Sequence, residues 1–185
     1  MPRTKLKAVL LDRDGVLNAK AGPHEYIRSP DALILLPNVA KAVAELRRAG
    51  LLLMVVTNQR GVSRGQLTEA DVEAIHNRLD AELAEEDGAI DRYYYCPHGH
   101  ADACYCRKPQ PGMLLNAMRE FGLMETECIL VGDSPSDLEA ADRAQMSSIF
   151  VGDARDAEGY TPIYIAADLA DAARYILAHF DTPNQ

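Results

Sequence analysis

Short, continuously apolar runs alternate in this chain with segments whose apolar residues recur at helical spacing. The apolar runs predict strands over 7–11, 51–56, 90–95, 128–131 and 148–151. An apolar run without in-and-out alternation is typical of a strand buried on both faces, as in a parallel sheet covered by helices. This pattern therefore restricts the chain to an α/β fold, with a central parallel sheet and helices on both of its faces.

The segments between the strands carry helix signals. They predict helices over 37–49, 68–86, 111–121, 135–144 and 169–179. Thr68 is a candidate N-cap of the second helix, and Gly50 and Gly122 mark the ends of the first and the third. The stretch 18–36 has neither pattern and is expected to form a loop or flap, too short for a large cap domain. Without an internal repeat or a linker, residues 1–185 are expected to form one domain.

Charge and hydropathy narrow the possible partners and the location. The chain has a formal net charge of −9 and no basic stripe, which argues against binding to nucleic acid. No apolar run approaches the roughly 18 residues of a membrane span, and no signal-peptide pattern follows the N-terminal residues. We therefore expect a cytoplasmic protein without membrane contact. It is expected to be a monomer, with a dimer left open, and to bind an anionic small molecule where a few cations converge.

Polar residues follow the predicted strands or lie in the loops beyond them. Asp12 and Asp14 follow the first strand, Thr57 the second and Asp133 the fourth, while Lys108 lies beyond the third. The alternative is that these are turn and cap residues, which explains the two aspartates equally well when they are taken alone. Ligands of open parallel sheets bind beyond the carboxyl ends of the strands. The shared placement of all five therefore favours a functional site at that edge.

These residue types suit the hydrolysis of a phosphate ester. Asp12 can attack phosphorus and form an aspartyl-phosphate. Asp14 can protonate the leaving alcohol and later activate water. Asp133 completes an oxygen-rich site for Mg²⁺, while Thr57 donates a hydroxyl and Lys108 a positive charge to the phosphate. The sequence thus predicts a magnesium-dependent phosphomonoesterase.

Three of the four cysteines lie close together, next to a histidine. The predicted ligands of a tetrahedral Zn²⁺ are Cys96, His98, Cys104 and Cys106. Four protein ligands leave no open position for water, so the ion is expected to be structural and to hold the loop of about 96–107. His100 is a rival ligand, and an unliganded cluster or a disulfide is the alternative. Cys128 is expected to be a small buried apolar residue.

Four motifs, in this order, resemble those of the haloacid dehalogenase (HAD) superfamily of phosphatases: Leu11-Asp12-Arg13-Asp14-Gly15-Val16, Thr57-Asn58-Gln59, Lys108-Pro109 and Gly132-Asp133-x-x-x-Asp137. The resemblance implies a Rossmann-like HAD domain in which Asp12 is the nucleophile and Asp14 the general acid and base. It implies that Mg²⁺ is bound by Asp12, the backbone carbonyl of Asp14, and Asp133. Asp137 fits a first-turn helical carboxylate that faces the helix dipole, with a contact to the metal shell as the alternative.

The loop motifs narrow the resemblance to the D-glycero-D-manno-heptose 1,7-bisphosphate 7-phosphatases and, more loosely, the histidinol-phosphate phosphatases. The motifs are the zinc-type loop, Thr57-Asn58-Gln59-Arg60-Gly61-Val62-Ser63-Arg64-Gly65 and Arg107-Lys108-Pro109-Gln110-Pro111-Gly112-Met113-Leu114. The first group implies cleavage of the 7-phosphate of a heptose bisphosphate, in the biosynthesis of nucleotide-activated heptose for lipopolysaccharide. The substrate contacts expected on this basis are Asp12, Arg13, Asp14, Lys20, Thr57, Asn58, Gln59, Arg60, Arg107, Lys108 and Ser134.

Within this set, Arg107 is implied to bind the distal phosphate, because a guanidinium fork suits a phosphate group, with a surface arginine paired to an acid as the alternative. Lys20 and His24 are candidate contacts from the flap, each with a solvated loop residue as the alternative. Two other functions stay open at this point. One is histidinol-phosphate hydrolysis, and the other is a catalytically silent, zinc-stabilised binding module.

Overall fold

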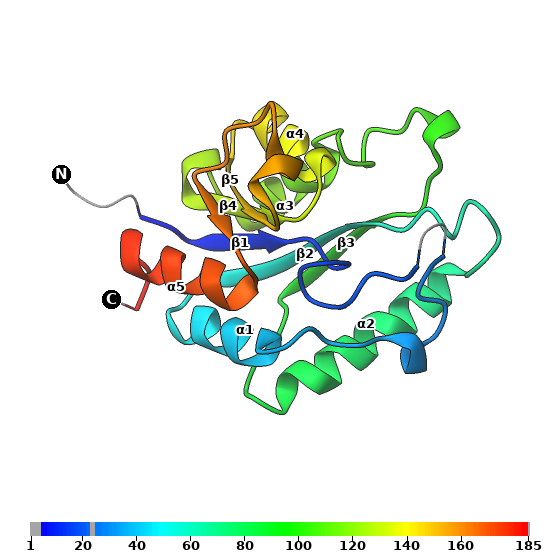
Figure 1. Cartoon of the computed structure of the whole chain (residues 1–185), viewed down its shortest axis with the longest axis horizontal. Helices are drawn as coiled ribbons and strands as arrows, with labels where there is room; N and C mark the ends of the chain where they lie inside the picture. The colour runs from blue at the N-terminus through cyan, green and yellow to red at the C-terminus, as the bar shows by residue number, and fades with distance from the viewer. Residues whose placement is uncertain (1–4, 23–24, 185) are drawn as a thin grey trace.

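The computed structural model describes residues 5–22 and 25–184. A six-stranded, entirely parallel sheet forms its centre, with the strand order β3-β2-β1-β4-β5-β6 (Figure 1). The strands are β1 (Ala8–Leu11), β2 (Leu52–Asn58), β3 (Arg92–Cys96), β4 (Cys128–Gly132), β5 (Ser147–Val151) and β6 (Tyr164–Ala166). The predicted parallel sheet is confirmed.

Helices cover both faces of this sheet. The helices are α1 (Val39–Arg48), α2 (Glu69–Ala84), α3 (Gly112–Phe121), α4 (Pro135–Arg143) and α5 (Leu169–His179). Short 3-10 helices are η1 (Pro30–Ala32), η2 (His100–Asp102), η3 (Glu125–Glu127) and η4 (Ala154–Ala157). Figure 1 shows α1, α2 and α5 on one face and α3 and α4 on the other, so the predicted α/β class is confirmed.

The apolar runs are continuous because each central strand contributes side chains to two hydrophobic cores, one on each face of the sheet. In β1, Val9 and Leu11 pack into the core under α1 and α5, while Ala8 and Leu10 pack into the core under α3. Successive side chains of a strand point to opposite faces, so both faces must be apolar. Full burial of one such side chain contributes roughly 1.5–3 kcal/mol, which makes β1 a firm support for the polar residues that follow it.

The strand order places a switch point at the centre of the sheet. From β1 the chain winds outward to β2 and β3, and from β4 it winds outward in the other direction to β5 and β6. Crevices open beyond the carboxyl ends of the strands at such a point. The register pairs Leu11 with both Val55 and Val131, so residues just after these three lie side by side at that edge.

The boundaries differ from prediction in a few places. Strand β6 was not predicted, because its three residues carry no pattern of their own. Strand β2 extends to Asn58, since Thr57 and Asn58 continue the pairing with β3. The predicted N-cap Thr68 is confirmed, because its side chain accepts a hydrogen bond from Asp71 N and the Asp71 carboxylate accepts one from Thr68 N.

The segment between β1 and α1 is the predicted flap. Its described residues contain η1 and isolated bridges that pair Asn18 with Asp14 and with Leu35, and they hold no cap domain. His24, a candidate substrate contact, lies outside the described residues. In the ranges that the structure describes, no helix has the length and apolar character needed to cross a membrane.

Candidate active site

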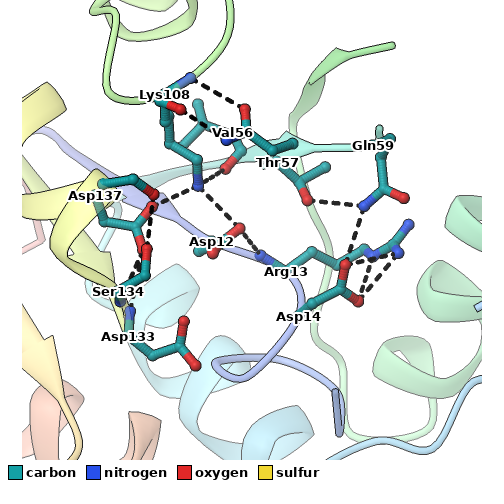
Figure 2. A network of polar contacts seen from close by, with 12 residues as sticks. Asp12, Arg13, Asp14, Val56, Thr57, Gln59, Lys108, Asp133, Ser134 and Asp137 are labelled. Atoms are coloured by element: carbon teal, nitrogen blue, oxygen red, sulfur yellow. Dashed lines mark hydrogen bonds and ion pairs between the residues drawn. The ribbon is translucent and has the colours of Figure 1, made fainter. Parts of the chain in front are cut away.

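The carboxyl ends of β1, β2 and β4 surround a cavity of about 280 Å³. Its lining contains these residues expected from the sequence: Asp12, Asp14, Lys20, Thr57, Asn58, Gln59, Lys108, Asp133 and Ser134. Distant segments of the chain therefore meet at one edge of the sheet, as the strand-end argument predicts. Figure 2 shows how the side chains of these residues lie, apart from Lys20 and Asn58, which it does not label.

Asp12 and Lys108 form an ion pair in this cavity. Lys108 Nζ lies 3.0 Å from Asp12 Oδ1, and both side chains are nearly inaccessible to solvent. Burial, opposed by the charge of Lys108 and reinforced by Asp137, Asp133 and Asp14, raises the pKa of Asp12 to about 7. A carboxylate in such surroundings is held ionised by cations, which makes the nearby positive charge important for a nucleophilic role.

Lys108 is fixed from two directions. Its ammonium donates to Val56 O at 2.8 Å and pairs with Asp137 Oδ1 at 2.5 Å. Its backbone is clamped by Asn58, which donates to Lys108 O and accepts from Lys108 N, both at 3.0 Å. Burial alone would lower the pKa of Lys108, but Asp12 and Asp137 outweigh this and raise it. The lysine therefore presents a permanent positive charge in a fixed place.

Asp137 contacts the start of its helix, which is the first of the two roles expected from the sequence, and also Lys108, which the sequence did not indicate. It begins α4 with a capping box, in which Oδ2 accepts from Asp133 N, Ser134 N and Ser134 Oγ at 3.2, 3.0 and 2.6 Å. Its other oxygen faces Lys108, as Figure 2 shows. Asp137 thus links the helix terminus to Lys108, and the Ser134 hydroxyl is engaged in the cap while Ser134 lines the cavity.

Three carboxylates stand close enough to share a cation. One oxygen each from Asp12, Asp133 and Asp137 lie within 4.8 Å of one another. Burial raises the pKa of Asp133, and its Oδ1 has no hydrogen-bond partner among the described residues. Its Oδ2 pairs with Lys20 Nζ at 2.6 Å. A buried, unsatisfied carboxylate oxygen beside a second carboxylate fits a hard divalent cation such as Mg²⁺.

The Asp14 side chain turns away from Asp12 and toward Arg13 and Gln59 (Figure 2). It accepts hydrogen bonds from Asn18 at 2.9 Å and from Gln59 at 3.0 Å, besides those from Arg13. Burial by itself would raise the pKa of Asp14, but Arg13 and the two amide donors lower it. Gln59 also donates to Thr57 Oγ1 at 2.9 Å, so it ties the carboxylate to the hydroxyl across the cavity.

The expected arginine contacts lie outside this cavity. The Arg13 side chain is fully buried and does not line the cavity. The prediction that this side chain contacts the substrate is therefore wrong, and only the Arg13 backbone remains a candidate contact. Arg60 is absent from the lining as well. Arg107 lines an adjoining hollow of about 210 Å³, which shares Lys108 with the first cavity, and it donates to His98 O at 3.2 Å.

Several lining residues were not predicted. Ala21, Glu25, Tyr26 and Ile27 come from the flap, and Ser136 from the start of α4. The flap residues have no strand or helix pattern that assigns them to the site. Their nearness in sequence to Lys20 is the one signal that pointed to them.

The predicted cysteine cluster is assembled at the end of β3. The ligand atoms of Cys96, His98, Cys104 and Cys106 lie within 4.8 Å of one another, and no disulfide joins these thiols. Cys106 Sγ is 3.1 Å from Cys96 Sγ and 3.2 Å from His98 Nδ1. The rival His100 instead faces Arg107, 3.5 Å away. Three sulfurs and one nitrogen at such separations fit a tetrahedral zinc ion.

The sequence and fold are similar to those of known phosphatases. Residues 105–172 match a family model described as HAD-hydrolase-like. The D-glycero-beta-D-manno-heptose-1,7-bisphosphate 7-phosphatase of Pseudomonas aeruginosa is 41% identical over 143 residues, 77% of this chain and 79% of the relative. The enzyme of that name from Escherichia coli (strain K12) is 38% identical over 148 residues, 76% of each chain.

A solved structure gives the same result. The D,D-heptose 1,7-bisphosphate phosphatase from B. bronchiseptica, complexed with magnesium and phosphate, matches with a TM-score of 0.87. It is 37% identical, and the match covers 94% of this chain and 99% of that chain. The similarity therefore extends over the whole sheet and the loops that surround the cavity.

Proposed function

Because the chain belongs to the D-glycero-beta-D-manno-heptose-1,7-bisphosphate 7-phosphatase family of HAD-like hydrolases, we propose that it removes the 7-phosphate of a heptose 1,7-bisphosphate. The observation that carries the proposal is the Asp12 carboxylate in a cavity at the switch point, paired with Lys108 and close to Asp133. The reaction would serve the supply of activated heptose for lipopolysaccharide.

The proposed reaction has two steps. Asp12 attacks phosphorus, the bond from phosphorus to the sugar oxygen breaks, and Asp14 gives that oxygen a proton. The aspartyl-phosphate is then attacked by water, which gives its proton to Asp14, and inorganic phosphate leaves as Asp12 is restored. Thr57 and Lys108 hold the phosphoryl oxygens and offset their charge in both steps.

A magnesium ion would be held by Asp12, Asp133 and the backbone carbonyl of Asp14. When bound, it neutralises charge on the phosphate and on the carboxylates around it. The carboxylate geometry described above supports this set, and the B. bronchiseptica relative was crystallised with magnesium. Asp137 is not assigned as a ligand, because it pairs with Lys108 and caps α4.

A zinc ion would be held by Cys96, His98, Cys104 and Cys106 and would have a structural role. We propose that it fixes the loop of about 96–107 against β3. Thiols serve as ligands in reduced form, which favours a cytoplasmic location. We also propose that residues 1–185 form one HAD-like domain that acts as a monomer.

Recognition of the second phosphate is assigned to the adjoining hollow. The charges of Arg107, Arg60 and Arg64 together lower the pKa of His100, so these guanidiniums gather near one place on an otherwise acidic protein. A bisphosphate can then place one phosphate at Asp12 and the other near Arg107. The relatives' names specify the beta anomer, and we propose the same preference.

A phosphate-release assay with Mg²⁺ tests this proposal. The substrates are both anomers of the heptose bisphosphate and histidinol phosphate. We expect the highest kcat/KM for the beta heptose bisphosphate. A preference for histidinol phosphate would replace the substrate assignment, and no release from any phosphomonoester would favour a silent binding module.

A further inference from the structure

A second polar network lies behind the cavity, and the reaction proposed above gives it no role. Its centre is Arg13, the largest fully buried side chain in the described part of the chain. A guanidinium stays charged in proteins, and a buried charge is costly unless hydrogen-bonding partners surround it. Because this side chain does not line the cavity, contact with substrate does not explain its burial.

Arg13 grips Asp14 with two of its three guanidinium nitrogens (Figure 2). Nε donates to Asp14 Oδ1 at 3.2 Å, and Nη2 lies 3.0 Å from both Oδ1 and Oδ2. A planar fork of this kind fixes the orientation of a carboxylate, which the single point charge of a lysine does not. Arg13 therefore sets the carboxylate plane of Asp14 together with the two amide donors, Asn18 and Gln59.

The third nitrogen of Arg13 faces His76 on α2. Nη1 lies 3.5 Å from His76 Nε2, and this is its one polar contact within the described residues. Burial, and then the charge of Arg13, lowers the pKa of His76 to about 3, so the ring is neutral and can accept from the guanidinium.

The His76 ring is itself held in place between α2 and β3. It stacks on Tyr93 with a centroid separation of 4.2 Å and an interplanar angle of 14°. The Tyr93 hydroxyl donates to Asp80 of α2 at 2.6 Å. The position of His76 is thus set by the helix and the strand, and not by the cavity.

We infer that Arg13 and His76 are positioning residues for the reaction: His76 sets where the guanidinium lies, and the guanidinium aims the Asp14 carboxylate at the leaving oxygen. The inference rests on the role proposed above for Asp14 as general acid. Small displacements of a catalytic group can cost about 100-fold in rate, so a residue behind the cavity can matter as much as one inside it.

The leaving group provides a test that a merely structural role would not pass. An alkyl leaving group such as a sugar oxygen needs a proton as its bond to phosphorus breaks, whereas p-nitrophenolate is a weak base and leaves without one. The ratio kcat/KM reports the steps up to departure of that group. Comparing a sugar phosphate with p-nitrophenyl phosphate therefore isolates proton donation by Asp14.

For Arg13→Lys we expect kcat/KM to fall about 100-fold with the sugar phosphate and less than about threefold with p-nitrophenyl phosphate. His76→Phe, which keeps a stacking ring but removes the acceptor, should show the same selective loss at about tenfold. His76→Gln, which restores an acceptor, should return to within about threefold of the wild type. Asn77→Ala, an exposed change beside His76 on α2 and outside this network, is the matched control and should leave the ratio of the two substrates unchanged.

Equal losses with both substrates, or a His76→Phe variant that behaves like the wild type, would overturn the inference. If Arg13→Lys does not fold, the comparison of His76→Phe with His76→Gln decides alone. The sugar phosphate in this test is whichever one the wild-type enzyme hydrolyses. An error in the proposed substrate would thus appear in the wild-type assay and leave the test of positioning intact.

Discussion

At the residue scale, Lys108 compensates a local excess of negative charge. It contacts Asp12 and Asp137 directly, and one oxygen of Asp133 lies within 4.8 Å of an oxygen of each of these two residues. Burial and the neighbouring carboxylates raise the pKa of Asp12 to about 7 even against the opposing charge of Lys108, so the lysine alone leaves Asp12 partly protonated near neutral pH. The ionised form that attacks phosphorus therefore depends on the positive charges around it.

Replacement of the nucleophile separates chemistry from folding. Asp12→Asn should reduce turnover to less than about a thousandth of the wild type, because an amide cannot form the aspartyl-phosphate. Zinc content and thermal unfolding should stay as in the wild type. Steady-state phosphate release with each purified protein measures the loss, and a residual activity above that level would contradict covalent catalysis.

The same scale shows what the sequence could predict about the site. Asp12 and Asp133 follow strands and Thr57 lies near the end of one, and the edge of a parallel sheet brings strand ends together whatever the conformation of the loops. The path of a long side chain has no such rule. Arg13 lies between two cavity residues in sequence, yet its side chain turns into the protein toward His76, a residue with no motif around it.

At the element scale, the packing of α2 against β3 makes stability depend on pH. Burial is the main reason that the pKa of His76 falls to about 3. The charge of Arg13 contributes to this lowering of the pKa, and Asp14 opposes it. Tyr93 stacks on the ring, and Asp80 accepts a hydrogen bond from the Tyr93 hydroxyl. Below its ordinary value of about 6.5, the unfolded chain takes up a proton that the folded protein does not. Acidification from pH 7 to pH 5 should therefore remove about 2 kcal/mol of stability through this histidine.

Urea unfolding of the wild type and His76→Gln at both pH values measures this contribution. Other groups titrate in both proteins, so the difference between the two free energies of unfolding isolates His76. Between pH 7 and pH 5, the wild type should lose about 2 kcal/mol more of its free energy of unfolding than His76→Gln does. A difference that does not change with pH would contradict a neutral, buried His76.

The cysteine loop is the second element with a measurable role. Cys104→Ser should lower zinc content and reduce kcat/KM for the bisphosphate about tenfold, because Arg107 then loses its support. Hydrolysis of p-nitrophenyl phosphate should change less, since Asn58 still clamps Lys108 to β2. Cys128→Ala, which removes a buried thiol away from the cluster, is the control. Retained zinc, or equal losses with both substrates, would count against this role.

Elements with a pattern of their own were predictable, and the others were not. The helix that became α5 is amphipathic, and its predicted bounds match the structure. Strand β6 has only three residues, and it exists because β5 offers a free edge for pairing. Such a strand is defined by its neighbour, so its residues alone do not reveal it.

At the scale of the whole molecule, cation binding should couple the site to global stability. Mg²⁺ at ten times its dissociation constant should stabilise the fold by about 1.4 kcal/mol and raise Tm by about 3–6 °C. Asp133→Asn should abolish most of this shift, because the carboxylate with an unsatisfied oxygen is lost. The control is Asp142→Asn, an exposed change in the last turn of α4, which should keep the full Mg²⁺-dependent shift in Tm. A full Mg²⁺ shift in Asp133→Asn would exclude this residue as a ligand.

The clamp of Asn58 on Lys108 has a consequence for how such a protein can change over time. Lys108 is held to the sheet by its hydrogen bonds with Asn58 of β2. Arg107, the residue before it, is held to the cysteine loop by its hydrogen bond to His98 O. Insertions or exchanges in that loop can redirect the protein to other phosphate esters without dismantling its bond-breaking machinery. Catalytic reactivity and substrate specificity therefore depend on different parts of the structure, the sheet and the cysteine loop.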